Sequence, residues 1–150
     1  MLEILHFEIR LPIKTKQMNI SSKPNFLSKN HHLLISFLAL VPTGIIYGTK
    51  SLVTEVFDIQ VNTIDLSNVL RAIMFLYLAV CLVLFLGMWK SKYWIRATQL
   101  NVIFMLSLAI GRVLSIILDG APTQALVVAM VVEFILGLLS IYQLRRIQRN

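Results

Sequence analysis

Two ionisable residues interrupt apolar stretches in the second half of the chain. Arg112 and Glu133 each lie deep inside a run of hydrophobic residues that is long enough to cross a membrane. An ionised side chain is costly to place in hydrocarbon, so such residues usually face a bundle interior, find a partner and mark a functional position. The short turn at residues 119–122 makes the two helices antiparallel neighbours. The two charges can therefore meet, and the chemistry to expect is an ion pair or a polar binding site.

Further polar residues are predicted at a similar depth. At 1.5 Å per residue, Arg112 lies about 9 Å below the outer end of its helix and Glu133 about 13 Å below that end of the next helix. Helical steps of three and four place Ser115 and Asp119 on the face of Arg112, and the stripe continues inward to Asn101. Whether Arg112 pairs with Glu133 or with Asp119 stays open. The predicted cluster lies in the outer half of the membrane and consists of Asn68, Arg71, Arg112, Ser115, Asp119 and Glu133.

These charges have two main interpretations. In the first, they form a structural ion pair that fixes the register of the helices. In the second, they line a pocket, open to the outer side, that binds a small molecule, a lipid headgroup or a proton. A partner protein that supplies a counter-charge is a third interpretation. Tyr47 and Tyr77 carry polar tips within reach of the cluster.

The sequence contains no set of residues that argues for catalysis. It has no Ser-His-Asp set, no glycine-rich phosphate loop and no pair of carboxylates on one helix. His31 and His32 have no Cys or carboxylate nearby in sequence, which favours an interfacial role over metal binding. The single cysteine, Cys81, lies inside an apolar run and is predicted to pack. We therefore predict no catalytic residue, no cofactor and no metal site.

Composition places the chain in a membrane. It is 57% hydrophobic and only 14% charged, whereas soluble domains are about 45–50% apolar and about 25% charged. The net charge of +7 comes from short basic clusters between apolar runs. That pattern is typical of Lys and Arg flanking membrane spans on the cytoplasmic side. A nucleic-acid partner is not expected, because no basic stripe with interleaved aromatic residues remains once the spans are removed.

Four spans are predicted, at about residues 33–49, 70–89, 98–118 and 123–144. The last three approach the roughly 20 residues that cross a hydrocarbon core of about 30 Å. The first is shorter and contains Pro42, so a signal peptide is the alternative, but the lack of a clean cleavage site favours a membrane anchor. In the longer outer loop after it, Phe57, Ile59 and Val61 alternate with polar residues. This alternation predicts an extended segment across the outer end of the bundle, with a loop dipping into the headgroups as the alternative.

The distribution of Lys and Arg predicts the orientation. Basic residues gather in the leader (1–32), in the loop between the second and third spans, and in the tail (145–150), while the other two loops are mainly acidic. All basic segments fall on one side of the membrane if both termini are cytoplasmic. Residues 1–17 match nothing downstream, so we expect an artefactual extension and a true start at Met18.

Small residues predict close contacts between the helices. Gly44 and Gly48 in the first span match the spacing of a helix-dimerisation pattern, which is predicted here to serve packing within the monomer. Gly111 in the third span and Gly137 in the fourth are predicted to serve packing in the same way.

A family resemblance rests on residues 68–71, 111–115 and 119–122 and on Glu133, which are NVLR, GRVLS, DGAP and E. Together they resemble a family of small bacterial four-helix membrane proteins, domain of unknown function 4345. The likeness runs from about Ser67 into the fourth helix. The family pattern favours glycine shortly after the second-helix arginine, where this chain has Met74 and Phe75, so close packing at that point is not implied. The resemblance implies a four-span bundle whose signature residues are those of the predicted cluster, and it implies no activity.

We therefore expect an all-α bundle of four spans in a bacterial inner membrane, with both termini in the cytoplasm. Its expected role is structural or ligand-binding, in a lipid bilayer, with a small-molecule or lipid ligand at the cluster. A homo-oligomer or a membrane partner protein stays open. The first alternative is a small-molecule or proton-coupled transporter that uses Glu133 as the exchangeable acid. The second is an intramembrane lipid-modifying enzyme, with Glu133 as general acid or base and Arg112 holding an anionic group.

Overall fold

The chain folds into helices joined by short connections. The computed structural model describes residues 26–149, with side chains from 29 to 147. The predictions for the leader up to residue 25, including a start at Met18, lie outside the described residues. The elements are α1 (Phe26–Gly48), α2 (Lys50–Phe57), α3 (Ile64–Trp89), a 3-10 turn (Ser91–Tyr93), α4 (Trp94–Asp119) and α5 (Gln124–Arg149). Residues 26–149 contain no strand, which confirms the predicted all-α class.

Four of these helices are long and apolar enough to cross a membrane. Their apolar segments are Lys29–Gly48, Ile64–Trp89, Ser91–Asp119 and Gln124–Ile147. Each reaches the roughly 20 residues that a hydrocarbon core requires. The first gains its length at its N-terminal side, and α1 continues through Pro42. The protein is therefore a multi-pass membrane protein, as its hydropathy predicts.

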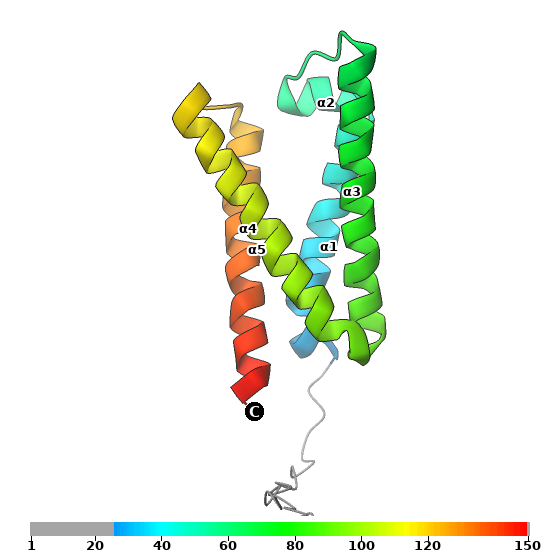
Figure 1. Ribbon diagram of the computed structural model, residues 1–150, viewed down its shortest axis with the longest axis vertical. Helices are drawn as coiled ribbons and strands as arrows, with labels where there is room; N and C mark the ends of the chain where they lie inside the picture. The colour runs from blue at the N-terminus through cyan, green and yellow to red at the C-terminus, as the bar shows by residue number, and fades with distance from the viewer. Residues whose placement is uncertain (1–25, 150) are drawn as a thin grey trace, which may run out of the picture.

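The four long helices form two pairs. α1 packs mainly against α3, and α4 packs mainly against α5 (Figure 1). After the 3-10 turn, α4 tilts away from α3, so the two pairs lie close at one end of the bundle and diverge toward the other (Figure 1). Leu33 of α1, Leu84 of α3 and Ala97 of α4 are fully buried in the core that joins the pairs at the close end.

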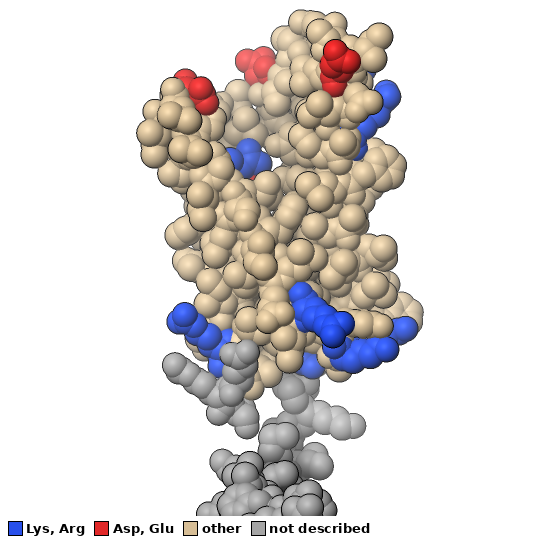
Figure 2. Space-filling model, in the orientation of Figure 1, with Lys and Arg blue, Asp and Glu red and all other residues tan. Residues whose placement is uncertain are grey.

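The two ends of the bundle differ in charge (Figure 2). The acidic end, where the helix pairs diverge, carries Glu55, Asp58, Asp65 and Asp119. The basic end, where they lie close, carries Lys90, Lys92, Arg96, Arg145 and Arg146. Among residues 29–147, the basic residues that lie toward the acidic end are Lys50, Arg71 and Arg112. The fold thus gathers at its two ends the charges that alternate between loops along the sequence.

In the segment between α1 and α3, the residues after Phe57 are non-helical and keep the predicted alternation: Ile59 and Val61 pack on an apolar cluster, while Asp58, Gln60 and Asn62 are exposed. The helix before them was not predicted. The chain forms α2 over Lys50–Phe57 and is irregular only from residue 58 to 63. Val53 and Phe57 of α2 are buried against side chains from α1, α3 and α5. The hydroxyl of Thr63 accepts a hydrogen bond from the Leu66 N–H at 3.1 Å and caps α3, which begins well before the predicted residue 70. An eight-residue helix is too short to persist alone, so tertiary burial and not a local signal determines α2.

Two of the predicted packing glycines bring α1 onto α3. A Cβ atom at Gly44 would lie 3.0 Å from the Cβ of Tyr77, and one at Gly48 would clash with the side chain of Met74. Close packing here therefore depends on the glycines of α1 and needs none on α3.

Of the other two glycines predicted to pack, Gly137 does so and Gly111 does not. A Cβ atom at Gly137 would lie 2.6 Å from Leu106 Cδ2, so this glycine lets α5 approach α4. Gly111 was predicted to pack but is exposed, and no atom lies within 4 Å of its Cβ position. That prediction is wrong because the tilt of α4 carries Gly111 away from the neighbouring helices. Gly87, which was not predicted, packs directly on Ala97 at the α3–α4 turn.

Candidate functional site

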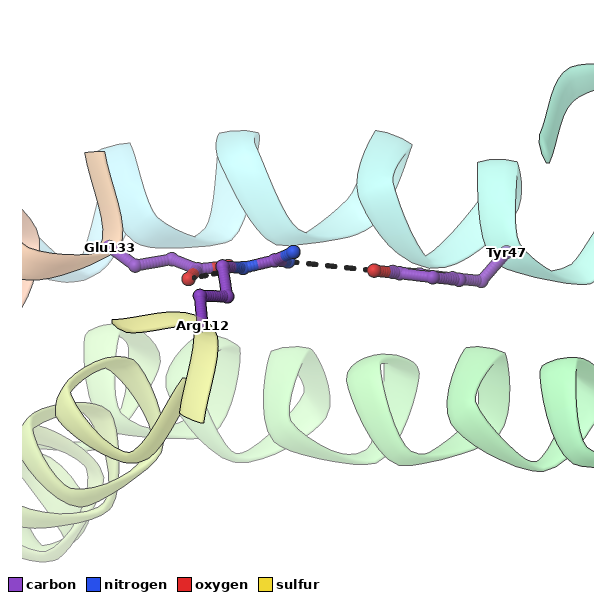
Figure 3. A network of polar contacts seen from close by, with 3 residues as sticks. All are labelled: Tyr47, Arg112 and Glu133. Atoms are coloured by element: carbon purple, nitrogen blue, oxygen red, sulfur yellow. Dashed lines mark hydrogen bonds and ion pairs between the residues drawn. The ribbon is translucent and has the colours of Figure 1, made fainter. Parts of the chain in front are cut away.

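The centre of the site is an ion pair between α4 and α5. Arg112 Nε donates to Glu133 Oε2 at 2.9 Å, and Arg112 Nη2 donates to Glu133 Oε1 at 3.1 Å (Figure 3). Two parallel N–H···O bonds of this kind fix the orientation of both groups. The side chains are only 16% and 8% exposed. The structure thus pairs Arg112 with Glu133 and not with Asp119.

Tyr47 extends this pair to the other half of the bundle. Arg112 Nη2 lies 3.5 Å from the hydroxyl oxygen of Tyr47, which comes from α1 (Figure 3). This distance is at the long limit for a hydrogen bond, so the contact is weak beside the bonds to Glu133. The Tyr47 ring packs against Phe57 of α2 and Tyr77 of α3, with ring centroids 5.1 and 5.6 Å apart. The guanidinium therefore sits where the two helix pairs meet below α2.

The other predicted cluster residues do not join this pair. Ser115 Oγ donates to Asp119 Oδ2 at 3.1 Å, one turn along α4, in an exposed position. Asn68 and Arg71 are exposed on α3, and within the described part of the chain neither has a hydrogen bond or an ion pair. The six predicted residues thus form one buried pair, one exposed pair and two separate residues. The tilt of α4 away from α3 explains the separation, and helical spacing does not report that tilt.

A groove runs beside the ion pair between α3 and α4. It encloses about 340 Å³ and is lined mainly by apolar surface, including Ile73 and Leu76 of α3 and Leu108 of α4. Arg112, Ser107 and Ser115 contribute polar atoms, and Gly111 forms part of the wall without a side chain. A smaller cavity of about 50 Å³ lies on the other side of Glu133, among α1, α3, α4 and α5. The site therefore combines one charged contact point with a mostly apolar groove, here named the α3/α4 groove.

A second group of polar residues lies closer to the basic end. Its members are fully buried on α1, α4 and α5 and are named here the polar layer: His32, Ser36, Thr98, Asn101 and Ser140. Asn101 Nδ2 donates to Ser36 Oγ and to Ser140 Oγ, both at 2.8 Å. His32 Nε2 lies 3.1 Å from Thr98 Oγ1.

Only part of the polar layer could be predicted from the sequence. Asn101 continues the stripe of Arg112, but its partners Ser36 and Ser140 lie on helices distant in sequence. The interfacial role predicted for the histidine pair does not hold for His32, which is fully buried.

The site offers hydrogen-bond donors and one paired carboxylate. Among the side chains from 29 to 147, no three His, Cys, Asp or Glu residues are placed to hold a metal ion. Cys81 is a free, buried thiol within the apolar core. What the arrangement can do chemically is bind a molecule that carries a hydrogen-bond acceptor and an apolar body.

Comparison with known proteins gives a family. No curated protein and no solved structure matches the chain. The family described as Domain of unknown function (DUF4345) matches residues 29–144. This match covers more than half of the chain, including most of each of the four membrane-length helices. The chain therefore belongs to the family of domain of unknown function 4345, and the resemblance noted from its sequence motifs is confirmed.

Proposed function

We propose that this protein is a ligand-binding protein of the membrane, and that the α3/α4 groove receives an amphiphilic molecule whose oxygen accepts a hydrogen bond from Arg112. The observation that carries this proposal is the set of N–H groups that Arg112 leaves free. A guanidinium has five N–H donors. The bonds to Glu133 and Tyr47 use Nε and Nη2. The Tyr77 hydroxyl also lies near the guanidinium, but no described residue forms a hydrogen bond of good geometry with Nη1, and this atom is not fully buried.

The charge of the site favours a neutral ligand head. Arg112 and Glu133 together carry no net charge, so an incoming anion would be attracted by one and repelled by the other. A carbonyl or hydroxyl oxygen can accept from Nη1 without that repulsion. The apolar side chains of the groove, such as Ile73 and Leu108, suit the hydrocarbon part of such a molecule.

The direction of entry follows from the predicted orientation. The positive-inside rule favours a cytoplasmic basic end, with both termini in the cytoplasm of a bacterium and the acidic end outside its inner membrane. The groove would then open toward the outer leaflet, beside the point where α4 tilts away from α3. A lipid-like molecule can reach it from that leaflet without crossing the bilayer centre.

Filling the groove from Gly111 is expected to abolish binding without unfolding the protein. Gly111→Leu adds a side chain at a position where the new Cβ meets no atom within 4 Å and which lines the groove, so it is expected to occlude the groove. Native mass spectrometry of protein released from lipid nanodiscs should show a discrete bound species in the wild type that is absent in Gly111→Leu. Ile110→Leu is the matched control, because Ile110 is 63% exposed next to Gly111 but does not line the groove. A species that persists in Gly111→Leu, or bare wild-type protein, would contradict the proposal.

Glu133→Gln tests the class of ligand in the same assay. This change keeps the shape of the side chain and removes the charge that balances Arg112. The retained species is expected to change from neutral to anionic, because the guanidinium charge is then uncompensated. The same anionic species in both proteins would show that the ion pair does not select a neutral head. If the bound species is recovered from the protein in a chemically altered form, the alternative function as an intramembrane lipid-modifying enzyme is indicated instead.

A further inference from the structure

The polar layer has a hydrogen-bond deficit that can be counted atom by atom at Asn101. Both amide hydrogens of Asn101 are used, one on Ser36 Oγ and one on Ser140 Oγ. Ser140 Oγ donates its own hydrogen to the carbonyl of Leu136 at 2.8 Å, so it can only accept from Asn101. The carbonyl oxygen Oδ1 of Asn101 is buried and has no partner within the described residues. Asn101 therefore needs a donor that the described residues do not supply.

His32 has the same need. Thr98 Oγ1 donates its single hydrogen to the carbonyl of Trp94 at 2.9 Å, so toward His32 it can only accept. Nε2 of His32 therefore carries the hydrogen, and Nδ1 is an acceptor. Nδ1 is buried and unpaired among the side chains that the structure describes, as is the indole N–H of Trp94. The His32 and Trp94 rings are in contact, with centroids 5.6 Å apart.

The depth of these atoms makes unpaired groups expensive. Asn101 lies seven residues past Trp94, where α4 begins, which is about 10.5 Å along the helix at 1.5 Å per residue. A buried polar group without a partner destabilises the fold, and hydrocarbon offers it no substitute. The deficit here is two acceptors, Asn101 Oδ1 and His32 Nδ1, and one donor, Trp94 Nε1. Water matches this deficit, because it donates two hydrogens and accepts as well.

We infer that the polar layer holds ordered water molecules, which donate to Asn101 Oδ1 and His32 Nδ1 and enter from the basic end. The basic end is the nearer source, because His32 lies one turn from the beginning of the α1 apolar segment at Lys29. The layer is built by α1 of one helix pair and by α4 and α5 of the other, and α1 contacts these two helices less extensively than they contact each other. Water here would complete the hydrogen bonds of the polar layer, which lies between the two helix pairs.

An apolar layer limits how far the water goes. One turn from Ser36, Asn101 and Ser140 toward the acidic end lie Leu40, Met105 and Leu136, all at most 3% exposed. These three side chains also line the small cavity that Glu133 borders. This apolar layer therefore lies between the hydrated layer and the ion pair, since Ser140 and Glu133 are seven residues apart on α5, about 10.5 Å along the helix. Water from the basic end reaches Asn101 but not Glu133.

Magnetic resonance of the wild-type protein in lipid nanodiscs tests this inference. Transfer of magnetisation from water should give a resolved cross-peak at the side-chain amide of Asn101, as it does at the exposed side-chain amide of Asn68. The backbone amide of Met105, in the apolar layer, should give none. The indole N–H of Trp94 is a second probe, since the sequence holds only Trp89 and Trp94 and Trp89 is exposed.

The outcomes of this experiment do not depend on the outcome of the mass spectrometry that tests the α3/α4 groove. An Asn101 amide as silent as Met105 would show a dry polar layer and overturn the inference. A water cross-peak at Met105 would overturn the limit set by the apolar layer. The measurement is made on the wild-type protein. A variant, Asn101→Gln, is needed only to assign the Asn101 signal.

Discussion

Glu133→Met alone is expected to destabilise the protein by about 3 kcal/mol, because it leaves the guanidinium of Arg112 charged and unpaired between helices. Arg112→Met should cost a similar amount by leaving the carboxylate of Glu133 unpaired. The side chains of both residues are largely buried and joined by two hydrogen bonds at 2.9 and 3.1 Å. The measurement is the free energy of unfolding in mixed detergent micelles.

The double variant, Arg112→Met with Glu133→Met, is expected to cost little more than either single change. Once one member of the pair is gone, removing the other takes away an unpaired buried charge and not an ion pair, so it adds little further cost. The double-mutant cycle should therefore give a coupling of about 2–3 kcal/mol between the two sites. Asp119→Asn is the matched control, because its bond to Ser115 is exposed and should contribute less than about 1 kcal/mol. Additive costs at 112 and 133 would mean that the pair contributes nothing as a unit.

The long helices and the central ion pair were predictable because each rests on a strong local signal. Apolar runs of membrane length report spans directly, since a bilayer admits few other structures. A charge inside such a run must find a partner, and the short turn after Asp119 left Glu133 and Asp119 as the two candidate partners of Arg112, between which the structure decides. The result required no knowledge of how the other helices pack.

The features that could not be predicted from the sequence depend on how the helices pack against one another. Helical spacing gives the face on which Arg71 or Gly111 lies but not whether another helix covers that face. The tilt of α4 leaves Gly111 beside an open groove and separates Asp119 from Arg71 (Figure 1). α2 was missed because its two buried residues, Val53 and Phe57, are held by helices distant in sequence. The polar layer could be predicted only in part for the same reason, since the partners of Asn101 lie on helices distant in sequence.

The second large effect contrasts two glycines that the sequence does not distinguish. Gly87→Ala is expected to destabilise the protein by about 1–3 kcal/mol, because inserting a methyl group into a well-packed contact forces the backbones apart. The new Cβ would meet the Cβ of Ala97, which is fixed to the α4 backbone and cannot rotate away. The effect arises at the turn where α4 leaves α3, so it also bears on the tilt that shapes the groove.

Gly111→Ala is the matched change and should have the opposite sign. Its Cβ meets no atom within 4 Å, so the gain in helix propensity, up to about 1 kcal/mol in an exposed helix interior, is not offset by a clash. Thermal unfolding of both variants in the same detergent should place Gly87→Ala below the wild type and Gly111→Ala at or above it. Equal destabilisation by both would mean that α4 packs against a neighbour along its whole length. In that case the divergence of the two helix pairs, and the α3/α4 groove with it, would not exist in the membrane.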